Sequence, residues 1–246
     1  MSEYEAWAEF GDALRLPVKD TDFVTGIPWE AADFKPELPL IDIGSGSGLT
    51  TVALAERFPE AEVVAVEPDW VMRSLLMLRI AERDDLRPRT TVLPESILDS
   101  WLPEQCGGAL LFNVIYFLGE RQREAFWQRM SRVLVPGAPV LMSRSYGAGE
   151  GPVERKLSSS ATLGRQEYQR WFAATPLDDG RVEITNDYLT LRDGEVVREV
   201  STRVTPFGLS EETIVDEIPV GSFGIEEIDD RYLAVRRHPD LRRRRR

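Results

Sequence analysis

Cysteine and histidine are almost absent from this sequence of 246 residues. It contains one cysteine, Cys106, and one histidine, His238. A single cysteine excludes a disulfide framework within the chain, and a single histidine excludes a His-rich metal site. No pair of acidic residues stands out as a magnesium site. We therefore expect no metal, and a reaction that relies on a histidine base is disfavoured, because His238 follows the last predicted strand.

Long apolar runs are missing as well. No stretch approaches the roughly 18 residues that suggest a membrane-spanning helix. The first residues, MSEYEAWAEFGD, are acidic and lack the basic and apolar regions of a signal peptide. With 42% hydrophobic residues, the chain is expected to be a globular, cytoplasmic protein with an ample core and no membrane partner.

Basic residues are scarce outside the last few positions. The net charge is -12 at pH 7, and 25 basic residues face 42 acidic ones once the terminal arginines 242–246 are set aside. A polyphosphate partner needs a basic surface, so nucleic acid is disfavoured as a partner. Residues 238–246 are expected to form a basic, disordered tail, with binding to RNA or to an acidic surface as the alternative.

Strand and helix patterns alternate over the first two thirds of the chain. Apolar, β-branched runs predict strands at 38–44, 61–68, 89–95, 108–117 and 138–145. Apolar residues at helical spacing predict helices at 49–58, 69–83 and 120–134. This alternation is typical of an α/β fold with a parallel sheet that helices cover on both faces.

The pattern changes after residue 145. Residues 146–164 are rich in glycine and serine and are interpreted as a loop. Residues 181–207 predict a β-hairpin around Asp193-Gly194, a pair that favours tight hairpin turns. Ser210 is the expected N-cap of a short helix at 210–218.

The segment LIDIGSGSGLT, residues 40–50, runs from a strand through three glycines into a helix. A nucleotide P-loop is excluded, because no lysine follows the glycines. The dinucleotide pattern GxGxxG would place its third glycine at position 49, whereas here it is Gly48. Asp42 at the mouth of the loop would repel a pyrophosphate. It would attract S-adenosyl-L-methionine (SAM), which carries a sulfonium and an α-ammonium and no phosphate.

A second acidic residue, Glu67, follows the next predicted strand. In a parallel sheet this position lies beside the glycine loop, where a carboxylate can accept hydrogen bonds from both ribose hydroxyls. The alternative is a surface carboxylate that caps the next helix, a role that Asp69 could equally fill. The loop and Glu67 together favour the ribose interpretation.

The acid-x-Gly-x-Gly-x-Gly pattern at 42–48, with Glu67 on the next strand, resembles class I (Rossmann-like) SAM-dependent methyltransferases of the small-molecule, natural-product type. The resemblance covers about residues 37–145 and, more loosely, 205–237. It implies a doubly wound, mostly parallel seven-stranded sheet with the last strand antiparallel. The hairpin at about 181–207 would be an addition near the C-terminal third. SAM would be the cofactor and S-adenosyl-L-homocysteine its product.

The resemblance also implies a set of cofactor-binding residues. Residues 95–97 fall where the family places polar and apolar neighbours of the adenine. In relatives that act on amino sugars, a tyrosine of the N-terminal segment closes over the methionyl end of SAM. This assigns Tyr4, with Trp7 at helical spacing, to a helical lid at 1–36, ahead of a SAM-binding domain at 37–237. The full cofactor set is Asp42, Gly44, Ser45, Gly46, Gly48, Glu67, Pro68, Glu95, Ser96, Ile97, Asn113 and Tyr4.

The acceptor side is expected at the end of the fourth strand. Asn113-Val114-Ile115-Tyr116 stands where amino-methyltransferases of nucleic acids carry Asn-Pro-Pro-Tyr, but both prolines are missing. Small-molecule methyltransferases also place a polar residue and aromatics here. Asn113 and Tyr116 are therefore the predicted catalytic residues, positioning a small-molecule acceptor through its nitrogen, oxygen or carbon.

Several alternatives stay open. A hydroxyl acceptor would need a general base, for which Tyr146, Glu154 and Tyr168 are candidates. The hairpin could wall the acceptor pocket or form a homodimer contact. Other functions are methylation of protein or nucleic acid, SAM binding without methylation, and a nicotinamide-dependent oxidation.

Overall fold

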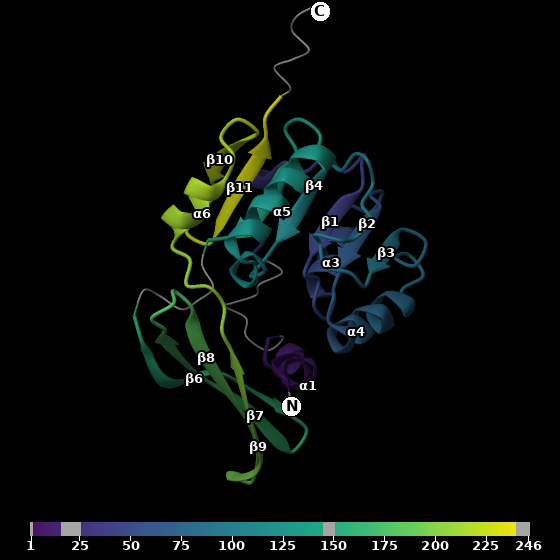
Figure 1. The fold of residues 1–246 in the computed structure, drawn as a ribbon. Coiled ribbons are helices and arrows are strands. Elements are labelled where there is room, and N and C mark those ends of the chain that lie inside the picture. Colours follow the sequence, from purple (N-terminus) through teal and green to yellow (C-terminus); the bar gives the residue numbers. More distant parts are fainter. Residues whose placement is uncertain (1, 16–25, 145–150, 240–246) are drawn as a thin grey trace, which may run out of the picture. The chain divides into compact units, whose positions relative to one another are not determined.

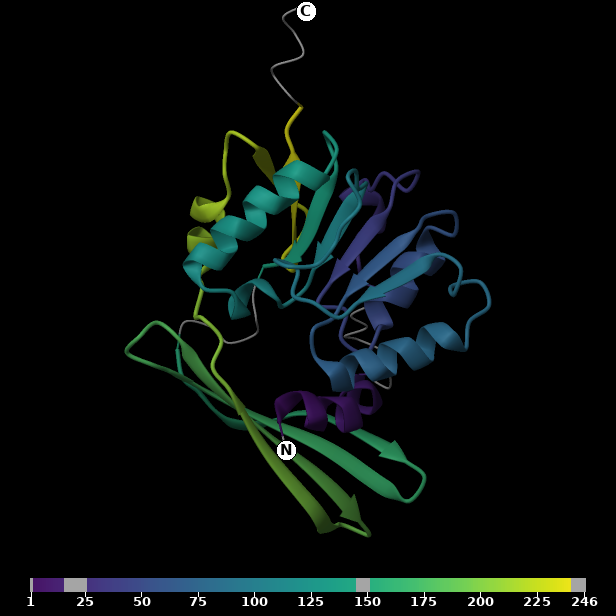
Figure 2. The ribbon, with the colours of Figure 1, turned by 45° about the vertical axis from the view of Figure 1, so that its right-hand side comes forward.

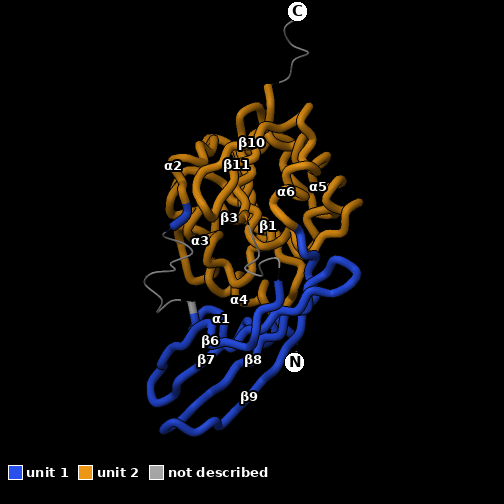
Figure 3. The backbone as a smooth tube through the Cα atoms, turned by 90° about the vertical axis from the view of Figure 1, so that its left-hand side faces the viewer, with its two compact units in different colours: residues 1–27, 147–209 blue, residues 28–146, 210–246 orange. Residues whose placement is uncertain are grey.

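The computed structural model describes residues 2–15, 26–144 and 151–239. The chain divides into two compact units, each built from two separate segments (Figure 3). Unit 1 comprises Met1–Ile27 and Gly147–Leu209, and unit 2 comprises Pro28–Tyr146 and Ser210–Arg246. These boundaries differ from the expected lid at 1–36 and single domain at 37–237, because unit 1 draws residues from both.

Unit 2 is built around a seven-stranded sheet with the strand order β10-β11-β5-β4-β1-β2-β3 (Figure 1). β1 to β5 pair in parallel, while β11 is antiparallel to both β5 and β10. This confirms the predicted doubly wound, mostly parallel sheet with an antiparallel last strand. Its strands are β1 Leu40–Ile43, β2 Val63–Val66, β3 Thr90–Leu93, β4 Gly108–Leu111, β5 Pro139–Ser143, β10 Phe223–Glu227 and β11 Tyr232–Arg237.

Helices cover this sheet, and its inner strands β1, β2, β4 and β5 are buried along their whole length. Burial on both faces explains why these strands read as continuous apolar runs. Figures 1 and 2 show α5 on the side of β4, β5 and β11, and α4 on the side of β2 and β3. Within the described ranges, no helix combines the length and apolarity that a membrane crossing requires. The helices of unit 2 are α2 Trp29–Ala32, α3 Leu49–Arg57, α4 Trp70–Ala81, α5 Glu120–Val133 and α6 Glu211–Glu217.

Arginine side chains satisfy carbonyl groups at the ends of three of these helices. Arg89 donates to carbonyls in the last turn of α3 and just beyond it, Arg236 to the last carbonyls of α2, and Arg237 to one in the last turn of α5. The last carbonyls of a helix lack partners within the helix, and a cation there also complements the helix dipole.

The strand predicted at 108–117 is wrong in its second half. β4 ends at Leu111, Asn113 has a φ of 62°, and Ile115–Phe117 form a 3-10 turn, η2. A left-handed residue cannot continue a strand. The apolar run persists because the turn itself is buried, with Ile115 and Tyr116 each 1% exposed. Hydrophobicity alone does not separate a buried turn from a buried strand.

Unit 1 contains a four-stranded antiparallel sheet with the order β6-β7-β8-β9. The predicted hairpin is confirmed as β8 and β9, and its turn residues Asp193 and Gly194 both have positive φ, 53° and 82°. Positive φ at both central residues is what a type I′ hairpin turn requires. The strands are β6 Val153–Leu163, β7 Gln166–Pro176, β8 Val182–Arg192 and β9 Glu195–Val204.

The loop predicted at 146–164 is wrong where the structure describes it, because Val153–Leu163 form β6. β6 is an edge strand, and most of its side chains are exposed. An edge strand is held by backbone hydrogen bonds on one side and needs no apolar alternation, so its sequence gives no strand signal. β7 was not predicted for a related reason, since most of its side chains are only partly buried.

Helix α1, Glu3–Arg15, belongs to the core of unit 1. Its buried stripe is Ala6, Phe10 and Leu14, and Phe10 stacks on Tyr188 of β8 with ring centroids 5.1 Å apart. The predicted amphipathic helix is therefore present, but its buried face is not the one suggested by Tyr4, which is 44% exposed. The i, i+4, i+8 spacing places Ala6, Phe10 and Leu14 on one face.

Glu3 fastens the first turn of α1 to the sheet. Its carboxylate accepts hydrogen bonds from the Asn186 amide at 3.1 Å, from the Tyr188 hydroxyl at 3.0 Å and from the Thr202 hydroxyl. All three donors are at most 5% exposed. Removing the carboxylate would leave them buried without this acceptor, which is costly.

We expect Glu3→Ala to lower the free energy of unfolding by about 2–4 kcal/mol, measured by urea denaturation. Glu9→Ala on the same helix is the control, since the Glu9–Arg198 ion pair is solvent-exposed and should contribute at most about 1 kcal/mol. Equal losses in the two variants would contradict the role assigned to Glu3.

Candidate functional site

The glycine loop and Glu67 meet at the carboxyl edge of the seven-stranded sheet. Ile43 pairs with Val66 in the parallel register of β1 and β2. The next two N–H groups of the loop, from Gly44 and Ser45, both donate to the Val66 carbonyl, at 2.9 Å and 3.1 Å. The loop is thus bound to the end of β2 from its first residue.

The loop backbone requires glycine at its first position. Gly44, Gly46 and Gly48 have φ of 68°, 57° and 91°. A Cβ added at Gly44 would lie 2.3 Å from Cγ2 of Val114, the residue after Asn113. The predicted acceptor turn therefore packs directly against the predicted cofactor loop, and only a hydrogen atom fits between them.

Asp42, the acid before the loop, is buried at 2% exposure. One carboxylate oxygen, Oδ2, accepts hydrogen bonds from the Thr50 hydroxyl at 2.8 Å and the Thr51 hydroxyl at 2.6 Å. Both threonines lie in the first turn of α3, so Asp42 binds the helix that follows the loop. Burial raises the pKa of Asp42 to about 6, and the two hydroxyl hydrogen bonds oppose this rise.

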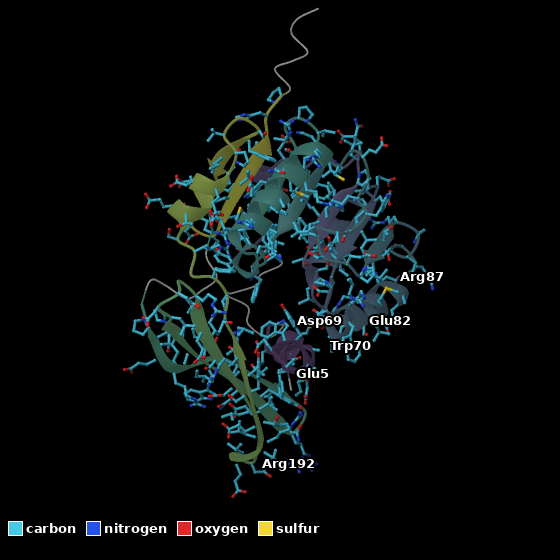
Figure 4. All side chains as sticks on the ribbon, in the orientation of Figure 1. Glu5, Asp69, Trp70, Glu82, Arg87 and Arg192 are labelled. Carbon is cyan, nitrogen blue, oxygen red and sulfur yellow. The ribbon has the colours of Figure 1, made fainter. Side chains whose placement is uncertain are left out.

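Glu67 holds the middle of the loop. Its Oε2 accepts the Gly46 N–H at 2.8 Å, and its Oε1 accepts the Asp69 N–H at 2.9 Å. Asp69 caps α4, its side chain accepting the N–H groups of Val71 and Met72. Figure 4 labels Asp69 and Trp70 where α4 begins. The capping role that competed for Glu67 is thus filled by Asp69.

The electrostatics of this edge suit SAM and disfavour a phosphate ligand. Burial, aided by the charges of Asp69 and Asp42, raises the pKa of Glu67, against the pull of the two backbone N–H groups. Arg73 contacts this region through the backbone carbonyls of Glu67 and Pro68, not through a carboxylate. Buried carboxylates beside a glycine loop can attract an ammonium or sulfonium and accept hydrogen bonds from hydroxyls.

The segment predicted to contact the adenine lies after β3, which pairs with β2 at the same sheet edge. Ile97 is 3% exposed and Glu95 is exposed. The Ser96 carbonyl accepts the N–H groups of Asp99 and Ser100, so residues 96–100 form a tight turn. Glu95, Ser96 and Ile97 stay predicted contacts of the adenine, as does the exposed Pro68.

Asn113 is held in a left-handed conformation by Ser143 at the end of β5. The Asn113 N–H donates to the Ser143 hydroxyl at 3.1 Å, and that hydroxyl donates to Oδ1 of Asn113 at 3.4 Å. A non-glycine residue with positive φ persists where its surroundings hold it, and such residues cluster at functional sites. Burial raises the pKa of Tyr116, and the charge of Glu211 adds to the effect.

Other predicted residues are not brought to this edge by the structure of unit 2. Tyr4, Glu154 and Tyr168 belong to unit 1, and the Tyr168 hydroxyl donates to Gln166 at 2.8 Å. Tyr146 and the tail residues 240–246 lie outside the described residues. The lid role of Tyr4 stays a prediction, and so does the basic, disordered tail.

The sequence analysis did not predict the residues whose side chains hold Asp42 and Asn113 in place. Thr50 and Thr51 hold Asp42, and Ser143 holds Asn113. The two threonines carried a usable signal, since hydroxyl residues directly after the last loop glycine can reach an acid at the strand end. Ser143 carried none, because its contact spans 30 residues of sequence.

Gly44→Ala should weaken SAM binding at least tenfold in calorimetry, because the new methyl group must displace Val114 at a strained φ. Gly164→Ala is the matched control. Gly164 has a similar φ of 61° with nothing within 4 Å of the added Cβ, so it carries the backbone strain without the clash. Equal SAM affinities in the two variants would contradict the packing argument.

Asp42→Asn should alter the pH dependence of stability. The pKa of Asp42 in the folded state lies above its ordinary value of 3.8. Its contribution to the free energy of unfolding is therefore fully present below pH 3.8 and is lost as the pH rises through about 6. Between pH 4 and 7 the wild type should therefore lose about 2–3 kcal/mol relative to Asp42→Asn in urea denaturation. The exposed Asp99→Asn serves as control. Parallel curves for wild type and Asp42→Asn would refute the shift.

Residues 40–137 match a family model described as a methyltransferase domain. Several solved structures resemble the whole chain in fold, each with a TM-score of 0.69. CalS10, an amino pentose methyltransferase from Micromonospora echinaspora, is 19% identical, and the match covers 96% of this chain and 97% of that one. The sugar N-methyltransferase KedS8 from Streptoalloteichus sp ATCC 53650 is 16% identical, with 98% and 94% covered. A SAM-dependent methyltransferase from Clostridium acetobutylicum ATCC 824 is 15% identical, with 96% and 99% covered.

Comparison with curated protein sequences gives no match. The family model spans the glycine loop, Glu67, the adenine segment and the acceptor turn, which together form the carboxyl edge of the sheet. The match and the fold agree with the predicted enzyme class and with SAM as its cofactor. Residues 40–137 match a methyltransferase domain, on a fold that the chain shares with SAM-dependent methyltransferases.

Proposed function

We propose that this enzyme transfers the methyl group of SAM to a small molecule of specialised metabolism, and that the acceptor is an amine of a sugar-containing compound. One observation carries the proposal. The Asn113 turn packs on the SAM loop through the contact of Val114 with Gly44. A polar side chain that could orient an acceptor therefore stands next to the predicted cofactor site. The acceptor class is taken from CalS10, an amino pentose methyltransferase, and from KedS8, a sugar N-methyltransferase.

The position of the single histidine supports an amine acceptor. In the antiparallel pairing of β11 with β5, Tyr232 lies opposite Ser143 and Arg236 opposite Pro139. His238 therefore follows β11 at the amino edge of the sheet, whereas Asn113 and Glu67 lie at the carboxyl edge. A neutral amine carries its own lone pair and needs orientation, not a base, while a phenol or alcohol would need a base.

Bound SAM would supply an electrophilic methyl carbon on its sulfonium. The residues of this chain bind and orient. Glu67 would accept the ribose hydroxyls, and Asp42 would attract the cationic end while holding α3 in place. Asn113 would orient the acceptor amine, and Tyr116, kept protonated by its burial, would contribute a neutral phenol. The amine nitrogen would give its lone pair to the methyl carbon as the methyl–sulfur bond breaks and S-adenosyl-L-homocysteine leaves, and the nitrogen would then release a proton to solvent.

A direct test incubates the full chain with methyl-labelled SAM and a panel of free and glycosidically linked amino sugars, phenols, total RNA and denatured protein. Label in an amino sugar, with an equal amount of S-adenosyl-L-homocysteine, is the expected result. Label confined to RNA or protein would replace the proposal with the macromolecular alternative. SAM binding without label transfer to any member would overturn it.

Glu67→Gln should raise the Kd for SAM at least tenfold in calorimetry, a loss of about 1.4 kcal/mol, because the amide can accept at only one of its two positions. Glu62→Gln is the control, since Glu62 is an exposed residue just before the same strand. Unchanged affinity in Glu67→Gln would remove Glu67 from the cofactor site.

A further inference from the structure

A buried arginine holds the far end of the acceptor turn. Arg123 of α5 is 4% exposed, and its Nη1 donates to the Leu118 carbonyl at 2.6 Å. Leu118 directly follows η2, the 3-10 turn that contains Tyr116. The main-chain N–H of Arg123 donates to the Gly119 carbonyl at 2.9 Å. Arg123 therefore fixes the position at which the turn leaves the site.

A carboxylate from a distant segment orients this arginine. Nε and Nη2 of Arg123 donate to the two carboxylate oxygens of Glu217 on α6, at 2.5 Å and 2.6 Å. The side chains are 5% and 24% exposed, so the pair is largely shielded from solvent. A bidentate pair of this kind fixes the plane of the guanidinium as well as its charge. The direction of Nη1 towards Leu118 thus depends on Glu217, 94 residues away in sequence.

Helix α6 makes a second bidentate pair at the other end of the turn. Nε and Nη2 of Arg144 donate to the carboxylate of Glu211 at 2.8 Å and 2.7 Å. Arg144 directly follows Ser143, whose hydroxyl holds Asn113. Glu211 and Glu217 of α6 are therefore paired with the two arginines next to the contacts that hold Asn113 and Leu118.

We propose that Arg123 and Glu217 are a positioning pair that holds residues 113–118 in the conformation that presents the acceptor for methylation. A non-glycine residue with positive φ, such as Asn113, costs energy and persists where its surroundings hold it. Ser143 supplies one hold, and the Arg123–Glu217 pair supplies the other at Leu118. The catalytic consequence rests on the function proposed above, whereas the conformational consequence does not.

The pair acts on the acceptor side and reaches the SAM loop only through the contact of Val114 with Gly44. Asp42 and Glu67 hold the cofactor loop through Thr50, Thr51 and Gly46, and none of these contacts involves α5 or α6. Loss of the pair should therefore loosen residues 113–118, while the hydrogen bonds of Asp42 and Glu67 keep the cofactor loop in place. A pair that served only general stability would loosen the whole of unit 2.

Amide hydrogen exchange of the folded full chain, followed by mass spectrometry, separates these outcomes. In Arg123→Met, peptides within 112–119 should exchange at least tenfold faster than in the wild type, while peptides from β1 and α3 exchange as before. The Kd for SAM should rise by a smaller factor than in Glu67→Gln, because the hydrogen bonds of Asp42 and Glu67 to the cofactor loop and α3 remain. Arg89→Met is the matched control, because Arg89 is a partly buried arginine that binds carbonyls at the end of α3 and should leave 112–119 unchanged.

Glu217→Gln provides a milder variant that keeps one acceptor oxygen for Arg123, and it decides the matter if Arg123→Met does not fold. It should speed exchange in 112–119 by a smaller factor. With any acceptor that the wild type methylates, kcat should fall at least tenfold in Arg123→Met, while the KM for SAM rises by less than that factor.

Unaltered exchange in 112–119, or a uniform rise over all peptides of unit 2, would overturn the proposal. Faster exchange in 112–119 with a wild-type enzyme that methylates no acceptor would support the positioning pair and refute the proposed function. The two hypotheses therefore fail separately.

Discussion

The parallel register of β1 and β2 is the constraint on which the site depends. Because Ile43 pairs with Val66, the residues that follow the two strands emerge side by side at one edge of the sheet. The loop can then begin with hydrogen bonds to the Val66 carbonyl, and Glu67 can accept the Gly46 N–H. A shift of one residue in this register would separate the carboxylate from the loop, and it would turn every side chain of the strand to the opposite face.

The parts of the site that the sequence predicts are those encoded within a few residues. Three glycines after an acidic residue predict the cofactor loop. An acidic residue after the next strand predicts the carboxylate beside that loop, because parallel strands bring their carboxyl ends together. The supporting contacts are encoded elsewhere. Ser143 reaches Asn113 across 30 residues, and Glu217 reaches Arg123 across 94. The sequence around Ser143 or Glu217 does not distinguish it from other polar residues. Only the folded chain therefore reveals these two contacts.

The fold was predictable where side chains are buried on both faces and unpredictable where they are not. The central strands are continuous apolar runs, and these give a clear signal. The exposed edge strand β6 lacks that pattern, although the hairpin of β8 and β9 was evident from Asp193-Gly194. The end of β4 was misjudged because η2 is as buried as a strand. Burial, more than conformation, is what the apolar pattern reports.

The division into units has a consequence for synthesis of the chain. Helix α1 is made well before its partners Asn186, Tyr188 and Thr202, which follow it by 183 to 199 residues. Strand β11 lies between β5 and β10 in the sheet but follows both of them in the sequence. Unit 1 can therefore close its core only after β8 and β9 are made, and unit 2 only after β11, and contacts between such distant segments slow folding. The apolar surfaces of α1 and β5 thus stay uncovered during synthesis until these later strands appear.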